Sequence, residues 1–315
     1  MNHIKLIVMK KIVIIIAIVA FNISDVKAQQ DPLFTQYMFN GLYLNPAYAG
    51  SHPYWSSTIT LRNQWVGFDG APKTGTVAID GPLPNQNMGL GAVFYHDRIG
   101  VTQQNTMVFN YSYSIKVNQA SKLAFGINGG FSQYSAKLTE LTVWDEDEVF
   151  EGDLSSKTLP KFGAGAYYYA EKYYLGFSVP TLFAYEDGVD FSLNLTQSSF
   201  LRRHYLLTGG YVFDIAKDFK LKPSFLAKYL QNAPLQADLN LSVLYKDTYW
   251  VGVSYRSSDA IAIILEYQTN LFFRIGYSYD FTLTELNNHS YGSHEIMLGI
   301  DLGKDLAKVK TPRFF

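Results

Sequence analysis

One segment of the 315-residue chain carries carboxylates dense enough to hold a metal ion. Carboxylate oxygens are the ligands that calcium prefers, so this segment could bind calcium. Its spacing lacks the central glycine of a calcium-binding loop, however, and a solvated acidic loop is the simpler interpretation. No metal is therefore assigned, and calcium binding stays an open alternative. The carboxylates are Asp145, Glu146, Asp147, Glu148, Glu151 and Asp153.

Two histidines are the candidate catalytic bases. His204 follows Arg203 and His294 precedes Glu295, each near the start of an expected strand, where charge pairing and anchoring at an interface explain them. No nucleophile-elbow motif and no metalloprotease helix motif accompanies them. The chain is therefore expected not to be an enzyme. A lipid hydrolase that assembles serine and histidine from adjacent strands is the enzymatic alternative.

Glycine-rich stretches offer a third possible chemistry, a nucleotide-binding loop. Gly89–Gly91 and Gly163–Ala166 lie within alternating strand patterns and do not open a helix, so this interpretation fails and no cofactor is expected. Glycine on a strand more often permits bending or the close approach of another segment. The chain has no cysteine, which excludes disulfides and thiolate sites, and its net charge of −1 gives no reason to expect a nucleic-acid partner.

Residues 1–28 are predicted to be a signal peptide. Lys5, Lys10 and Lys11 precede the apolar run Ile12–Phe21, which is about half of the ~20 residues that a spanning helix needs. Cleavage after Ala28 would leave Gln29 at the mature N-terminus. The protein is therefore expected to be exported.

The elements that must position these residues are strands. In residues 273–280, Phe273 and Ile275 fall on one face while Arg274 and Asp280 fall on the other, and several other segments alternate in the same way. Aromatic residues make up 16% of the chain and gather near the expected strand ends. A polar lumen inside an apolar, aromatic-girdled exterior accounts for both features. The ionised residues expected in the lumen are Lys116, Asp238, Glu266, Arg274 and Asp301.

No stretch after residue 28 approaches 18 uninterrupted apolar residues, so a spanning structure would have to be a closed barrel. We predict an all-β fold, a transmembrane antiparallel up-and-down β-barrel of about fourteen strands with an N-terminal non-barrel segment. The expected strands are 54–64, 73–81, 88–96, 103–117, 121–137, 161–171, 173–180, 202–215, 219–230, 235–246, 248–257, 260–268, 271–280 and 291–302.

Connection lengths predict the orientation. Short polar connections such as Asn118–Ala120 and Glu171–Lys172 are typical of periplasmic turns. The longer connections, expected outside the cell, are Val66–Pro72, Leu138–Pro160, Thr181–Leu201 and Phe281–Ser290. The chain thus divides into a signal peptide (1–28), a periplasmic or plug segment (29–51), an outer-membrane barrel (52–303) and a periplasmic tail (304–315).

Several blocks of the mature chain form a recognisable series. It opens with Gln30–Asn40 and Leu44–Ser51 and continues in order with Arg62–Pro72, Gly89–Gly91, Asp97–Gly100, Arg203–Tyr205, Trp250–Arg256, Gly276–Asp280 and Ser293–Ile296. This series resembles the PorP/SprF family of type IX secretion and gliding-motility proteins. The first two blocks resemble the opening signature of that family, although Gly41-Leu42 stands where proline is common.

The resemblance implies an outer-membrane component that assists the export or surface anchoring of adhesin-like cargo. Its expected partners are the outer-membrane lipid bilayer, a secreted cargo protein with a C-terminal sorting domain, and periplasmic and outer-membrane components of the type IX machinery. A passive pore or a hydrophobic-solute transporter is the alternative, because the alternating polar face also suits a channel.

The N-terminal segment has two open interpretations: it docks or gates for partners, or it fills the mouth of the barrel as a structural plug. Asn45-Pro46 and Gly50 form turns, and polar and aromatic side chains around them suit either role. The candidate partner-binding residues are Gln36, Tyr37, Asn40, Asn45, Pro46, Tyr48, Arg62 and Trp65.

Overall fold

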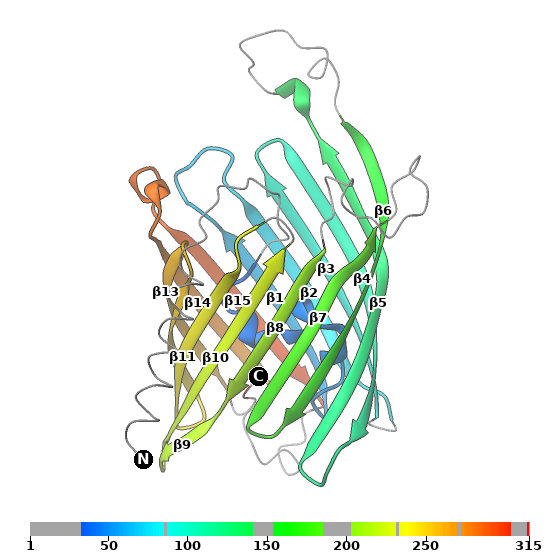
Figure 1. Ribbon diagram of the computed structural model, residues 1–315. Helices are drawn as coiled ribbons and strands as arrows, with labels where there is room; N and C mark the ends of the chain where they lie inside the picture. Colours follow the sequence, from blue (N-terminus) through cyan, green and yellow to red (C-terminus); the bar gives the residue numbers. More distant parts are fainter. Residues whose placement is uncertain are drawn as a thin grey trace, which may run out of the picture.

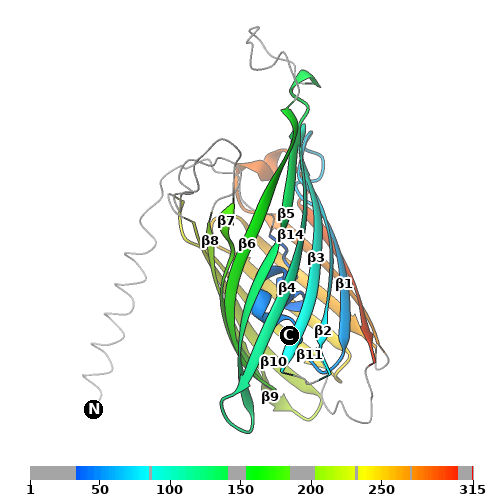
Figure 2. The ribbon, with the colours of Figure 1, turned by 90° about the vertical axis from the view of Figure 1, so that its right-hand side faces the viewer.

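The sheet of this protein closes on itself to form an antiparallel barrel (Figures 1 and 2). A computed structural model describes residues 33–84, 87–140, 154–184, 203–230, 233–269, 272–303 and 314. Strands that are neighbours in the sequence pair with each other, β15 returns to pair with β1, and β10 pairs with β11. Apart from β9, which pairs only with β10, every described strand therefore has a paired strand on each side, as a lipid environment requires.

The fifteen described strands contain fourteen crossings, because β8 and β9 are two parts of one crossing that both pair with β10. Their bounds are β1 (Trp55–Asn63), β2 (Lys73–Pro82), β3 (Met88–Ile99), β4 (Thr102–Lys116), β5 (Ser121–Ala136), β6 (Leu154–Ala170), β7 (Tyr173–Ala184), β8 (His204–Tyr211), β9 (Phe213–Ala216), β10 (Phe219–Leu230), β11 (Gln236–Tyr245), β12 (Tyr249–Arg256), β13 (Ala260–Gln268), β14 (Phe273–Thr282) and β15 (Ser293–Leu302).

The predicted barrel is confirmed, and the differences lie at strand ends. β6 begins at Leu154, seven residues before its predicted start, because residues 154–160 pair with the end of β5 and so satisfy their backbone groups. The predicted outer loop Leu138–Pro160 is shorter by the same amount. The predicted strand 202–215 is interrupted at Val212, whose N–H donates to the carbonyl of Lys172 at 2.7 Å.

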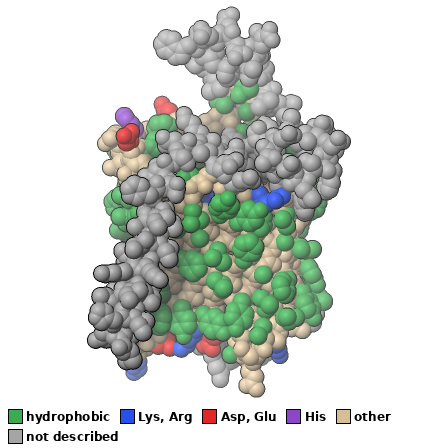
Figure 3. Space-filling view, viewed as in Figure 1, with side chains coloured by type: hydrophobic (Ala, Val, Ile, Leu, Met, Phe, Trp, Pro, Cys, Tyr) green, Lys and Arg blue, Asp and Glu red, His purple; other side chains and the backbone are tan. Residues whose placement is uncertain are grey.

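The outer face is apolar and the inner face polar, as the alternation predicted. In β13, Ile261, Ile263 and Leu265 point outward, whereas Ile264 and Glu266 are buried inside. Figure 3 shows apolar side chains covering the described wall on one side of the barrel. The prediction for Lys116 is wrong: this lysine ends β4 and is exposed beside the following turn.

Aromatic rings gather on the outer face toward one end of the barrel. They lie at the ends of strands that meet in short turns, the arrangement of an interfacial aromatic girdle. The ring contacts there include Tyr168–Tyr173, Tyr173–Tyr211, Tyr211–Phe213, Phe219–Tyr245 and Tyr249–Tyr267.

These turns define the short-turn end of the barrel, with connections at 117–120, 171–172, 217–218 and 246–248. The opposite, long-loop end carries the connections 64–72, 137–153 and 283–292, although other connections there, such as 100–101 and 257–259, are also short. Two of these loops contain a short 3-10 helix: η3 (Leu138–Glu140) follows β5, and η5 (Glu285–Asn288) follows β14. Because fourteen crossings are an even number, the chain enters and leaves the barrel wall at the short-turn end.

The residues before β1 fold inside the barrel. They form η1 (Tyr37–Phe39), α2 (Gly41–Leu44) and η2 (Pro46–Tyr48), which appear as the blue elements within the lumen in both ribbon views (Figures 1 and 2). None of the helices in the described residues is long and apolar enough to cross a membrane. The predicted signal peptide, the acidic residues 145–153 and all of the tail except Phe314 lie outside the described residues.

Candidate functional site

The segment Leu33–Ser51, called the plug below, is the candidate functional site. Nearly all of its residues are buried, although the segment has little regular secondary structure. Its three helical pieces are each only three or four residues long, so intrinsic helix stability cannot hold them. The plug must therefore be held by its contacts with the barrel wall.

An ionic cluster in the wall anchors the beginning of the plug. The Thr35 and Gln36 N–H groups donate to the two carboxylate oxygens of Glu295, at 2.8 and 2.9 Å. The Thr35 hydroxyl donates to Asp280 at 2.8 Å. Arg62 binds both acids, with Nη2 2.7 Å from Asp280 and Nη1 3.1 Å from Glu295. The arginine thus bridges the carboxylate that holds the plug backbone, Glu295, and the one that holds the Thr35 side chain, Asp280.

The same cluster extends along the wall to a second arginine. Arg256 lies 3.0 Å from Asp238, 3.3 Å from Asp259 and 3.6 Å from Asp280. Arg62, Asp238, Asp280 and Glu295 are all at most 3% exposed. Removing one partner of such a buried pair typically costs ~3–5 kcal/mol, because the remaining charge is left without compensation. The plug therefore begins at a buried and highly charged cluster of wall residues.

An aromatic cluster holds the middle of the plug. The ring of Phe39 lies 6.1 Å from that of Trp250, and Lys222 Nζ lies 5.2 and 5.4 Å from the two rings. Such cation–π contacts strengthen where water is excluded. The Tyr37 hydroxyl accepts a hydrogen bond from Asn240 Nδ2 at 2.5 Å, and burial raises the pKa of this tyrosine well above its ordinary value.

Phe314, the one described residue of the tail, joins the same cluster. Lys222 Nζ donates to the Phe314 carbonyl, and Lys220 Nζ lies 5.1 Å from the centre of its ring. Phe314 is only 5% exposed and belongs to the apolar cluster that contains Phe39 and Trp250. The sequence predicted a periplasmic tail here, and the structure places this residue of the tail inside the lumen.

Polar bonds to the opposite wall fix the end of the plug. Asn45 Oδ1 accepts from the N–H of Ala47, and Asn45 Nδ2 donates to the carbonyls of Ala166 and Phe177 at 3.0 and 3.4 Å. The hydroxyls of Ser178 and Ser112 donate to the carbonyls of Leu44 and Ala49, each at 2.6 Å. The wall thus supplies the partners that the irregular backbone of the plug lacks.

Glycines on the inner face make room for the plug. A Cβ on Gly126 would lie 2.2 Å from the Ala47 nitrogen, and one on Gly165 would lie 2.1 Å from Asn45 Oδ1. One on Gly276 would lie 2.1 Å from Gln36 Oε1. Real Cβ atoms essentially never approach so closely. The predicted role of strand glycines, close approach by another segment, is therefore the one that the structure shows.

Seven of the eight candidate residues lie together in this site. Arg62 is in the wall, and six belong to the plug: Gln36, Tyr37, Asn40, Asn45, Pro46 and Tyr48, all buried. Trp65 lies apart, half-buried in the β1–β2 loop with a positive φ of 47°, where its N–H donates to the hydroxyl of Ser293 at 3.1 Å. In this conformation all seven are buried inside the protein, so they could reach a partner only if the plug moved.

Sequence reasoning missed the wall residues that hold the plug. Asp280 and Glu295 occupy inward positions of alternating strands, as do Asn240 and Lys222. The alternation places them in the lumen. No local pattern, however, indicates that they contact the plug, which lies more than 150 residues away in the sequence. The available signal was the set of charged side chains at inward positions, because buried charges need partners.

The two histidines lie in different environments. His204 is buried in the lumen, whereas His294 is half-exposed on the outer face, with Nδ1 2.8 Å from the Tyr277 hydroxyl. Glu295 points to the other side of the wall and binds Arg62, so it does not pair with His294. Within the part of the chain that the structure describes, no group of three or more metal-ligating side chains is found.

The comparison with solved structures gives matches of low sequence identity. A Pseudomonas aeruginosa FadL homologue is 12% identical, with 86% of this chain and 94% of that chain covered and a TM-score of 0.43. A TodX deltaS2S3 mutant monoaromatic hydrocarbon channel is 10% identical, with 82% and 92% covered and a TM-score of 0.45. The KdgM porin is 12% identical, with 78% and 97% covered and a TM-score of 0.38. These values support no argument about function.

The sequence itself gives a more specific result. None of the curated proteins compared with the chain matches it. The family described as type IX secretion system membrane protein PorP/SprF matches residues 26–300, which include the plug and nearly the whole barrel. A closed barrel with an apolar outer face and an aromatic girdle is the structure that an outer-membrane protein requires. The chain belongs to the PorP/SprF family of type IX secretion system membrane proteins and is an outer-membrane β-barrel.

Proposed function

We propose that this barrel is a sealed, non-enzymatic partner of the type IX machinery that assists the export or surface anchoring of adhesin-like cargo, of the gliding-motility type. The observation that supports this proposal is the plug. It binds Glu295 on β15, Trp250 on β12, Ala166 on β6 and Ser112 on β4, so its contacts surround the lumen. A cargo polypeptide would have to displace all of these contacts to pass through.

A sealed barrel must meet its partners at its ends. At the long-loop end, the β1–β2 and β14–β15 loops are tied together, because the Val66 N–H donates to Gly292 and the Tyr291 N–H donates to Val66, at 2.8 and 2.7 Å. These paired loops expose Phe68 and Tyr291, the latter to 77%. Exposed aromatic side chains on a braced loop favour a protein contact. We assign cargo contact to this pair of loops, and contact with periplasmic components to the short-turn end.

Purification of a tagged protein in detergent tests the assignment. Cargo with a C-terminal sorting domain, together with type IX components, should co-elute with the wild type. A Phe68→Ser, Tyr291→Ser variant should lose the cargo and keep the barrel. A matched Phe125→Ser variant, changed on the lipid-facing wall, should keep both. Equal cargo recovery from all three proteins would contradict contact at the paired loops.

Deletion of Asp31–Ser51 with the signal peptide retained separates the roles of the plug. Without this segment, planar-bilayer conductance should rise from near zero to that of an open barrel. If cargo export stays normal in a correctly inserted deletion variant, the plug has no docking role and only seals the lumen. If the wild type already conducts ions and passes solutes, the passive pore is the correct function and the sealed-partner proposal falls.

A further inference from the structure

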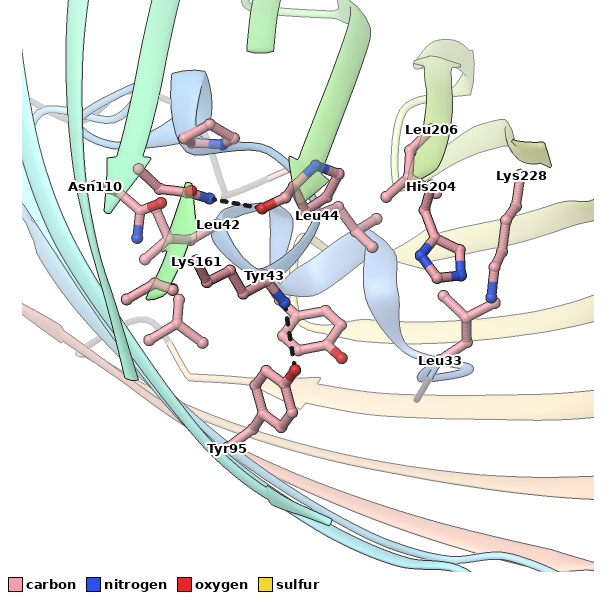
Figure 4. Close-up of a pocket in the computed structure, with 15 residues that line it drawn as sticks. Leu33, Leu42, Tyr43, Leu44, Tyr95, Asn110, Lys161, His204, Leu206 and Lys228 are labelled. Carbon is pink, nitrogen blue, oxygen red and sulfur yellow. Dashed lines mark hydrogen bonds between the residues drawn. The ribbon is translucent and has the colours of Figure 1, made fainter. Parts of the chain in front are cut away.

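A hollow lies on the outside of the barrel at the long-loop end. It contains about 430 Å3 of free volume, a size typical of small-molecule sites. The β1–β2 loop forms one side of the hollow, and the adjoining ends of β1, β2 and β3 form the other. The space between the plug and the wall is much smaller, about 40 Å3, because side chains such as Tyr43 and Tyr95 converge there (Figure 4). That space has room for only a few water molecules, so the hollow outside is the better candidate for a ligand site.

Hydrogen bonds on both sides fix the loop that borders the hollow. The Gly100 N–H, in the turn after β3, donates to the Gly70 carbonyl at 2.8 Å. On the other side, the Val66 N–H donates to the Gly292 carbonyl at 2.8 Å. The β1–β2 loop is therefore held against its neighbours without a ligand, and the hollow is largely formed in advance.

Two cationic side chains on the outward face line the hollow. Lys73 on β2 and Arg98 on β3 are direct partners in the antiparallel ladder, and Asn63 on β1 is the partner of Lys73 on the other side. The neighbouring residues Thr74 and Asp97 are buried, and their side chains bond to each other at 2.6 Å. Because successive residues of a strand face opposite sides, Lys73 and Arg98 point away from the lumen.

These two cations lack an acidic partner. Among the described residues, the Lys73 side chain forms no ion pair or hydrogen bond, and Arg98 only donates from Nε to the Gly100 carbonyl at 3.4 Å. Like charges at opposite positions of a ladder repel each other. Asp69 is the single carboxylate among the described lining residues, so two positive charges against one negative leave the lining with a net charge of +1. An anion in the hollow would relieve the repulsion between the two cations.

The wall between the hollow and the short-turn end faces lipid. Leu61, on the same strand as Asn63, is 58% exposed, and Val77 and Phe94, which are partners in the β2–β3 ladder, are each 43% exposed. β1 has nine residues, so at ~3.3 Å per residue and a tilt of ~40° it rises ~20 Å, close to the ~25 Å height of the lipid-facing band of such barrels. Because Asn63 ends β1, the cation pair beside it lies at the level of the lipid head groups.

We propose that the hollow binds the phosphorylated sugar head group of an outer-leaflet lipid, of the lipid A type, whose acyl chains lie on the apolar wall below it. The short turns of such barrels lie in the periplasm, so the long-loop end is at the outer leaflet. A phosphate group accepts charge-assisted hydrogen bonds from Lys73 and Arg98, and the sugar lies beside the polar side chains of Asn63 and Gln64. A soluble anion or an acidic peptide would use the cations but leave the apolar surface below them unused. This site goes beyond the assigned cargo contact and does not depend on it, although both use the β1–β2 loop.

Native mass spectrometry of the detergent-purified barrel, titrated with diphosphoryl lipid A, tests the site through the lipid that the protein retains. The wild type should retain one lipid saturably. A Lys73→Met, Arg98→Met variant should bind at least about tenfold more weakly, because both charge-assisted bonds are lost. Asp69→Asn should bind about two- to fivefold more tightly, since it removes a carboxylate that repels the phosphate. The matched control is Lys116→Met, Lys122→Met, which removes another directly opposed pair of cations at the short-turn end and should bind like the wild type.

Several results would overturn the site. One is equal binding by the Lys73→Met, Arg98→Met variant and its control, in preparations whose heat-modifiable mobility shows folded barrels. Another is equal binding of a lipid with the same acyl chains and no phosphate, which would reduce the contact to unspecific adhesion of acyl chains to the wall. Full displacement of lipid A by inorganic phosphate would replace the lipid by a free anion. Unchanged lipid binding by the Lys73→Met, Arg98→Met variant, together with a loss of cargo recovery, would assign the hollow to an acidic segment of the cargo instead.

Discussion

A single methyl group at Gly126 should displace the plug. In a Gly126→Ala variant the new Cβ would lie 2.2 Å from the Ala47 nitrogen and 2.4 Å from the Pro46 carbonyl carbon. Ordinary contact begins at 3.4 Å, so the plug backbone would have to move by about 1.2 Å. Both contacted atoms are backbone, and no side-chain rotation can relieve the overlap. Overpacking of this kind costs ~1–3 kcal/mol, which corresponds to a shift of ~5- to 150-fold in the equilibrium between seated and displaced plug.

Thiol labelling measures this equilibrium directly. Because the chain has no cysteine, Met38→Cys provides a single reporter within the buried part of the plug. The rate at which a water-soluble maleimide modifies this cysteine should rise ~5- to 150-fold when Gly126→Ala is added. The matched control is Gly129→Ala in the same strand, because a Cβ there would meet only the Phe162 ring at an ordinary 3.5 Å.

The refuting result is equally direct. If Gly126→Ala and Gly129→Ala label at the same rate as the parent, the close approach of plug and wall does not hold the plug. Wall glycines would then only reduce side-chain bulk. If both variants label faster by the same factor, the change lies in β5 itself and not in its contact with the plug.

Three further predictions follow from the wall. Arg62→Met should lower the free energy of unfolding by ~3–5 kcal/mol, because Asp280 and Glu295 would stay buried beside the plug without this cation. Urea titration in detergent measures this free energy. An unchanged unfolding midpoint would contradict the role of Arg62 in anchoring the plug. Leu241→Lys should destabilise insertion into lipid vesicles by ~2–4 kcal/mol, since this side chain faces outward near the middle of β11, and normal folding yield would refute the lipid-facing assignment. Phe314→Ala should lower the free energy of unfolding by about 3 kcal/mol, because the contacts around Lys222 are lost, and it should speed amide hydrogen exchange in η1. Unchanged exchange in η1 would contradict this prediction.

The barrel could be predicted because its signal is local. Period-two alternation, as in Phe273–Asp280, places each side chain inside or outside without any knowledge of its partner strand. The ends of strands were less predictable. Pro160 and the polar residues before it suggested a loop, yet they lie in β6 because the end of β5 offers them backbone partners. Strand pairing is a tertiary property, and the local sequence does not encode it.

Six of the eight candidate residues lie in the plug, but their role could not be derived from the sequence. Gln36, Asn45 and Tyr48 suit a docking surface and a buried plug equally, since hydrogen-bonding side chains and aromatic rings serve both. The structure gives them partners within the same chain. Gln36 and Asn45 donate hydrogen bonds to Glu295 and to the Ala166 carbonyl, and the ring centres of Tyr48 and Tyr167 lie 5.6 Å apart. Whether they also meet a second protein depends on motion of the plug.

The sequence by itself determined the class of fold, the approximate number of strands and which side of each strand faces lipid, because these follow from the chemistry of neighbouring residues. The tertiary structure alone decided what fills the lumen. Arg62 and Glu295 are 233 residues apart in the sequence, and only closure of β15 against β1 brings them to 3.1 Å. Barrel closure places opposite charges and open glycine positions around one irregular segment. The inward residues of separate strands therefore hold the plug together.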